Sequence, residues 1–253
     1  MSINFNFEED RFSLNKQLLP SRHYYFNDSE NYIKLLNIGE GIFPKDRIKT
    51  SFSLKDSNLV ITTESATKIY KSKKEYGINC INIDLNNSNL EFINDELILY
   101  EESKYIQTFR LNFDESSTFF YVDILSSGRS YENFDFTSML MKNSFYIKSD
   151  ENKKLEYIEK FDVKGSELKD YIQRKSSQKR LFAKIYIRTH TNDNLLDKLY
   201  LEGFESFTYS KSKKIIIASI SFENMSKLKN EVNRVWEIYR KEIGKSTFNL
   251  GKQ

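Results

Sequence analysis

Hydrophobic and polar residues alternate with a period of two along several stretches of the first 190 residues. The clearest examples are Ile81–Leu85, Tyr105–Phe113 and Leu181–Ile187. This period is typical of strands with one buried face. Polar segments such as Asn86–Asn89 separate the stretches and are typical of turns. Strands that follow one another this closely, without helices between them, predict an antiparallel or coiled β architecture.

The pattern changes to helical spacing near the C-terminus. Asn192–Leu201 and about Asn224–Ile243 each place apolar residues three and four positions apart, which predicts two amphipathic helices. In the longer helix, Val232, Trp236 and Tyr239 fall on one face. We therefore expect Trp236 to be buried.

Three further segments complete the predicted architecture. Thr118–Leu125 is almost continuously apolar, so we expect a strand covered on both faces. Lys213–Phe222 predicts another strand, and the polar, charged segment Gly165–Arg180 is the best candidate for a mobile insertion. The chain is thus predicted to be one large, mainly β domain over residues 1–253, made of many stacked or coiled strands. It comprises a β-rich region (18–190), an α+β tail (191–244) with two helices, and loose termini.

Composition restricts the classes of function. The 253 residues include 20 Phe and 16 Tyr but only 8 Gly and 2 Pro, which suits a large packed core and argues against disorder. A net charge of +3 is too small for a nucleic-acid footprint. The chain has neither a membrane-spanning apolar run nor a signal-peptide pattern at Met1–Asp10. The single cysteine, Cys80, excludes an internal disulfide and favours a cytoplasmic location.

No recognised catalytic motif occurs in the chain. It lacks a P-loop, a nucleophile elbow, a dinucleotide fingerprint and a zinc-protease motif. His23, His190 and Cys80 are well separated in sequence, so they predict no stable nickel cluster of the His/Cys type. Two basic clusters, Lys71–Lys74 and Lys211–Lys214, are interpreted as solvated turns. The alternative is a docking patch for an acidic partner.

The most informative segment combines a strand with an unusually polar continuation. Leu59–Ile61 is apolar, and Thr62–Ser72 then follows without Gly or Pro. Buried polar groups cost free energy unless they are paired, so an ordinary core strand would not carry them. This segment resembles the signature T-T-Q-x-A-x-K-V-Y-x-S of the urease accessory protein family UreD, also called UreH. Glu64 stands where that signature has glutamine.

Other segments resemble the same family in the same order. Gly41–Ile48 is similar to G-G-L-V-x-G-D-x-L, and Leu90–Ile93 to L-E-Y-L-P. Ser127–Phe136 resembles P-G-R-x-x-x-G-E-x-F, although Phe134 replaces the glutamate, and Val235–Arg240 resembles L-W-x-x-x-R. The resemblance covers roughly residues 18–244.

The resemblance implies a function in urease maturation. It implies a β-rich fold without enzymatic activity, a role in delivering nickel, and three partners: UreF, the GTPase UreG and apo-urease. It implies no stably bound cofactor, and only transient contact with nickel. Carboxylates in the family-like segments, Asp46, Glu64 and Glu91, are the candidate contacts because a conduit should bind a divalent ion weakly. The alternative interpretation is that each forms an ordinary salt bridge.

We further expect a polar cluster at the Thr62–Ser72 segment. Thr62, Thr63, Glu64 and Lys68 would lie inside or at the mouth of the β structure, with Arg129 as a bridge between Glu64 and Lys68. Two other functions remain open at this stage. One is a β-rich scaffold or interaction protein without a metal role, and the other is a hydrolase or isomerase with an unrecognised carboxylate site.

Overall fold

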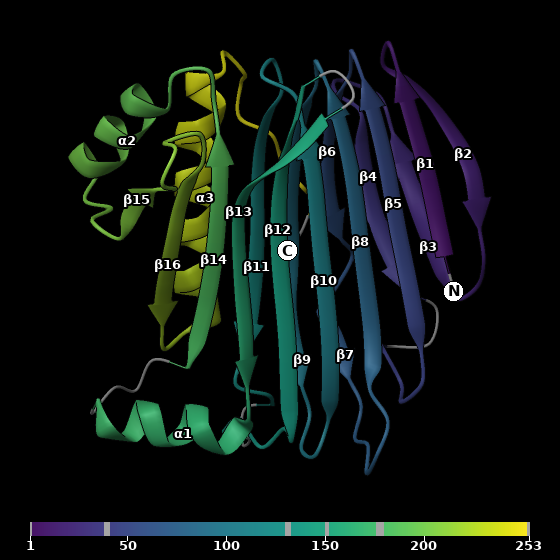
Figure 1. Cartoon of the computed structure of the whole chain (residues 1–253), viewed down its shortest axis with the longest axis vertical. Coiled ribbons are helices and arrows are strands. Elements are labelled where there is room, and N and C mark those ends of the chain that lie inside the picture. Colours follow the sequence, from purple (N-terminus) through teal and green to yellow (C-terminus); the bar gives the residue numbers. More distant parts are fainter. Residues whose placement is uncertain (1, 38–40, 130–132, 150–151, 176–179, 252–253) are drawn as a thin grey trace.

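The computed structural model describes residues 2–37, 41–129, 133–149, 152–175 and 180–251. These residues form two sheets and three helices (Figure 1). Sheet A is ordered β13 (Asn152–Val163), β12 (Ser138–Ser149), β10 (Lys104–Phe113), β8 (Gly77–Asn86), β5 (Arg47–Lys55), β1 (Ser2–Glu8), β2 (Arg11–Gln17). Sheet B is ordered β15 (Phe207–Tyr209), β16 (Ile216–Phe222), β14 (Leu181–Arg188), β11 (Thr118–Ser126), β9 (Asn89–Leu99), β6 (Asn58–Thr63), β4 (Tyr32–Asn37), β3 (Ser21–Phe26), with β7 (Thr67–Ile69) also paired to β9.

The central strands form a flattened coil. From β5 to β12 the chain alternates between the sheets, so that β5, β8, β10 and β12 are parallel neighbours in sheet A. In sheet B, β6, β9 and β11 are likewise parallel. Antiparallel strands flank this coil at both ends of each sheet. The expected coiled β architecture is therefore confirmed.

Short arches connect sheet A to sheet B, and hydrogen bonds join successive arches. The amide of Ser57 donates to Ser88 Oγ, and the amide of Ser88 donates to Ser117 Oγ, both at 3.2 Å. Asp56 and Asn87 adopt positive φ angles of 48° and 47°, which Asp and Asn tolerate better than most residues. The polar turn segments of the sequence thus hold the coil in register at this edge.

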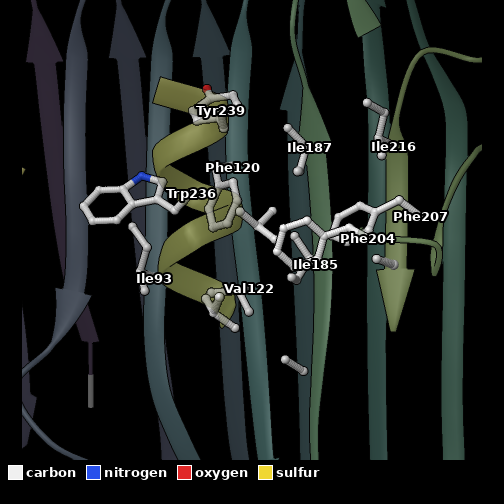
Figure 2. Packing of buried hydrophobic residues seen from close by; sticks show 14 of the residues in the cluster. Ile93, Phe120, Val122, Ile185, Ile187, Phe204, Phe207, Ile216, Trp236 and Tyr239 are labelled. Carbon is white, nitrogen blue, oxygen red and sulfur yellow. The ribbon is translucent and has the colours of Figure 1, made fainter. Parts of the chain in front are cut away.

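Hydrophobic residues form a core between the sheets and a second core outside sheet B. Phe5, Phe52, Phe92, Phe109 and Phe145 belong to the inner core. The outer core lies under α2 (Asn192–Leu201) and α3 (Met225–Glu242), as Figure 2 shows for Trp236 and Tyr239 beside Phe120 and Val122. Every residue of β11 is buried. The expectation of a strand covered on both faces is thus confirmed.

Two segments differ from the expectations. Gly165–Arg174 forms α1, a helix in addition to the two expected near the C-terminus. Leu168 and Ile172, four residues apart, bury one face of α1 against Phe134 and Phe136; the sparse apolar residues of this segment hid its amphipathic face. The part of the expected insertion at residues 176–179 lies outside the described residues. Residues 2–17 form β1 and β2, whereas we had expected a loose terminus.

Candidate functional site

The Thr62–Ser72 segment is interrupted in the middle. Strand β6 ends at Thr63, and β7 begins at Thr67 in register with Leu97 of β9. Glu64–Ala66 therefore leave the sheet between two strands that pair with the same neighbour. Thr62 Oγ1 donates to the carbonyl of Ile93 at 2.6 Å. This break leaves residues 94–96 of β9 without a paired strand on that side.

A cavity of about 110 Å³ lies behind this break, between the two sheets. Its walls include Thr63 and Ala66 from the interrupted segment, and its polar groups include Asn94, Gln107 and Asp123. Asp123 and Gln107 are both buried. The resemblance to the family signature therefore falls on residues that line an internal polar space.

This inner cavity adjoins a larger cavity on the outer side of sheet B. The outer cavity has a volume of about 590 Å³ and extends under α3, where Lys229 and Trp236 line it. Ser65, Ala66 and Asp95 line both spaces. The two cavities thus meet at the interruption between β6 and β7.

A third cavity also adjoins the inner one. It has a volume of about 480 Å³ and lies beside α1 and β13, with Phe161, Leu168 and Phe182 among its walls. Asp123 and Met141 line both this cavity and the inner one. The three spaces, here called the cavity series, therefore share wall residues: Asp123 lines the inner and third cavities, and Ala66 lines the inner and outer ones.

Asp123 is the central ionisable group of this series. Its carboxylate accepts hydrogen bonds from Tyr121 Oη at 2.6 Å, Gln107 Nε2 at 3.1 Å and Asn143 Nδ2 at 3.0 Å. Burial raises the pKa of Asp123, and these hydrogen bonds only partly oppose the shift. Asn143 also donates to Tyr186 Oη, which in turn donates to Glu159. A buried network thus connects the inner cavity to the third one.

The expected polar cluster is distributed over several contacts. Glu64 is half exposed and forms an ion pair with Lys34 at 3.5 Å. Thr63 Oγ1 accepts a hydrogen bond from the amide of Asp95 at 2.8 Å. The guanidinium of Arg129 stacks over the ring of Tyr100, 4.2 Å from its centroid. The contacts thus place Glu64 at the outer cavity and Arg129 at the end of the sandwich.

The main chain at Lys68 contacts a second family-like segment, Gly41–Ile48. The amide of Ile42 donates to the carbonyl of Lys68 at 2.8 Å. Gly41 has a φ of +151°, and a Cβ atom there would lie 2.3 Å from the same carbonyl oxygen. Gly41 is thus required for the close approach to β7. Asp46 closes the next turn, because its carboxylate accepts the amide of Phe43 at 2.9 Å.

Glu91 lies in a buried ionic network under α3. It is fully buried, and its carboxylate accepts hydrogen bonds from Trp236 Nε1 and Arg240 Nη1, both at 2.6 Å. Lys245 Nζ lies 3.1 Å from its other oxygen. Arg240 is also buried and forms a second ion pair with Glu30. These contacts give Glu91 a structural role in fastening the C-terminal helix to sheet B.

The structure does not bring the three candidate nickel contacts together. Asp46, Glu64 and Glu91 each have separate partners, and the described residues contain no group of three His, Cys, Asp or Glu side chains that could hold a metal ion. Asp123 and Asp95 were missed by sequence reasoning. For Asp123 a signal existed, because it is the one carboxylate within the apolar stretch Thr118–Leu125.

Comparison with known proteins shows similarity over most of the chain. The family model for the UreD urease accessory protein matches residues 18–250. A urease accessory protein UreD of Aliarcobacter butzleri (strain RM4018) is 68% identical over 254 residues, covering both chains in full. One from Staphylococcus epidermidis (strain ATCC 12228 / FDA PCI 1200) is 36% identical over 117 residues, which is 45% of this chain and 42% of that protein.

The fold and the cavities define a coiled β-sandwich protein with a hydrophobic core and a polar internal cavity. Among the described residues, no helix is both long and apolar enough to cross a membrane. The family match extends over nearly the whole chain. The chain belongs to the UreD family of urease accessory proteins.

Proposed function

We propose that this chain is a scaffold and nickel-delivery component in urease maturation, with no catalysis of its own. The observation that supports this is the cavity series, in which Ala66 is a wall shared by the inner and outer cavities and Asp123 a wall shared by the inner and third ones. A conduit must hold its cargo weakly at several points. Scattered carboxylates suit that requirement better than a converging set of ligands, which would trap the ion.

The residues of the series differ in how readily they would contact nickel. Glu64 lies at the outer cavity and Asp95 at the first junction, while Asp123 lies at the second. We therefore place these three first. Asp46 and Glu91 line none of these three cavities, so we place them second.

The partners proposed for this role are UreF, UreG and apo-urease, in the cytoplasm. The names of the matching proteins support this, because each is called a urease accessory protein. The alternative is a β-rich scaffold that assembles urease without handling metal. The two proposals differ in one respect, namely whether the interior of this chain must stay open.

Blocking the junction tests that difference. Ala66→Phe places a ring where the inner and outer cavities meet, at a half-buried position. We expect the variant to fold and to bind its partners, yet to yield urease with little nickel. Ser166→Phe, on the exposed face of α1, is the matched control and should yield fully loaded urease.

Three measurements on each variant decide the outcome: a denaturation curve, the nickel content of purified urease, and urease activity. Full nickel loading with a folded Ala66→Phe variant would favour the scaffold without a metal role. Fully active urease in a strain lacking this gene would refute both forms of the proposal.

A further inference from the structure

The end of the sandwich farthest from the helices has an unusual surface. Figure 1 shows β2 and β3 together at this end, where β2 is the last strand of sheet A and β3 the last of sheet B. Among the described residues, twelve large hydrophobic side chains are exposed, and five of them lie between Leu14 and Phe26. They are Leu14, Leu18, Leu19, Tyr24 and Phe26. We call these residues, with the cations named below, the β2–β3 surface.

The same stretch carries positive charge and no carboxylate. Between Arg11 and Phe26 the sequence contains Arg11, Lys16 and Arg22 but neither Asp nor Glu. Within the described part of the chain, none of these three cations has an ion-pair partner. Elsewhere, surface lysines commonly pair with acids, as Lys55 does with Glu8 at 2.8 Å.

Aromatic rings hold the two edge strands at a fixed separation. Phe12 of β2 stacks on Tyr25 of β3 with centroids 4.5 Å apart, and His23 lies 5.6 Å from the same ring of Phe12. The edges are therefore preorganised by the inner core. Strand edges carry unpaired main-chain donors and acceptors, and proteins usually shield them. Here neither β2 nor β3 contains a proline.

We propose that the β2–β3 surface is the docking site for an extended segment of a protein partner in which apolar residues alternate with Asp or Glu. Pairing to the free strand edge would satisfy main-chain groups of both chains. The apolar residues would cover Leu14 and Tyr24, and the acids would meet the exposed cations Arg11 and Lys16. This inference rests on the proposed function, since it names the surface by which that function's partners are held.

Two other occupants fit the surface less well. A second copy of this chain would bring the same unpaired cations against one another, and like charges facing across an interface are unfavourable. An anionic membrane would attract the cations but would leave the main-chain groups of both edges without partners.

The experiment uses full-length protein with the accessory proteins and apo-urease of the same organism. Hydrogen exchange, compared between the free chain and the complex, should show protection of amides in β2 and β3. The double variant Arg11→Glu/Lys16→Glu should weaken the complex at least tenfold and reduce its dependence on salt concentration. Tyr24→Ser should weaken the complex about tenfold, as expected for an aromatic hot spot.

Two control variants match these changes. Leu201→Ser removes a side chain that is 88% exposed on α2, and Lys211→Glu reverses an exposed charge near β16. Both should bind like the wild type. Because all the substituted residues are exposed, a denaturation curve for each variant should match that of the wild type.

The outcomes separate the docking proposal from the proposed function. If the wild type binds and activates urease while the β2–β3 variants bind within twofold of it, the docking proposal is wrong and the proposed function stands. If protection of β2 and β3 arises instead with phosphatidylglycerol vesicles, or by self-association in sedimentation, the docking proposal is also wrong. If the wild type neither binds these partners nor supports activation, both proposals fall.

Discussion

The buried network around Glu91 gives a quantitative prediction for the attachment of α3. Glu91 and Arg240 are both fully buried, and Nη1 of Arg240 lies 2.6 Å from the Glu91 carboxylate. Removing one member of a buried ion pair leaves the other charge uncompensated and costs about 3–5 kcal/mol. Glu91→Leu removes the acceptor for Trp236, Arg240 and Lys245 at once, so we expect a loss at the upper end of that range.

Replacing the other partner, Arg240, should cost less free energy of unfolding. In Arg240→Met, Glu91 keeps its hydrogen bond from Trp236 and its ion pair with Lys245, so we expect about 3 kcal/mol. In the double variant neither charge is left behind, because both partners are replaced by apolar side chains. Its loss should therefore be smaller than the sum of the two single losses by about 1–3 kcal/mol.

Urea denaturation at neutral pH measures these free energies of unfolding. Trp236 is the only tryptophan in the chain, so its fluorescence reports the same network that is perturbed. Lys160→Ala is the control, because Lys160 and Asp162 form an exposed pair at 2.9 Å whose loss should cost less than about 1 kcal/mol. A cost below about 1 kcal/mol for Glu91→Leu, or strictly additive losses, would show that the network does not fasten α3.

Four further predictions follow from single sites. Burial raises the pKa of Asp123, so the carboxyl stays protonated in the folded protein at a pH where it has lost its proton in the unfolded chain. The contribution of Asp123 to the free energy of unfolding therefore falls as the pH rises above the ordinary pKa of 3.8. Asp123→Asn should flatten this decrease in denaturation curves measured between acidic and neutral pH. Trp236→Ala should cost about 3–5 kcal/mol in urea denaturation, because the indole is buried in the outer core; unchanged stability would contradict that packing. Gly165→Ala should lower the thermal midpoint, because a Cβ atom would lie 2.1 Å from the carbonyl oxygen of Phe134; an unchanged midpoint would mean that the main chain relaxes there. Glu64→Gln should change the free energy of unfolding by less than about 1 kcal/mol, because its ion pair with Lys34 is half exposed; if nickel loading of urease is also unchanged, Glu64 has no role in delivery.

Sequence periodicity was sufficient to predict those helices and strands that a local residue pattern defines. The helix Asn192–Leu201 has the predicted bounds, and α3 begins and ends within a residue of its prediction. The burial of Trp236 is confirmed because apolar spacing along one helix face selects the buried side irrespective of what covers it. By the same reasoning, an apolar run without alternation identified β11 as the strand covered on both faces. The sequence alone also indicated the family, because each signature segment is an uninterrupted run of residues.

The candidate site depended on contacts between distant segments. Glu91 lies on β9 in a family-like segment, but its partners Trp236, Arg240 and Lys245 come from the other end of the chain. Sequence spacing contains no information on such pairs. The cavity series is likewise a property of strand order, since Ala66 and Asp123 meet the same space only after β6, β9 and β11 lie side by side.

One physical cause separates what the sequence determined from what the tertiary structure decided. The sequence alone determined where strands and helices form, because hydrophobic period and turn residues act over a few positions. Only the tertiary structure decided which polar groups become internal, because burial depends on what packs over them. Asp123 lies inside an apolar stretch and Glu64 comes three residues after one. Residues of α1, β12 and β14 line the space beside Asp123, whereas Glu64 leaves the sheet and pairs with Lys34 at the surface.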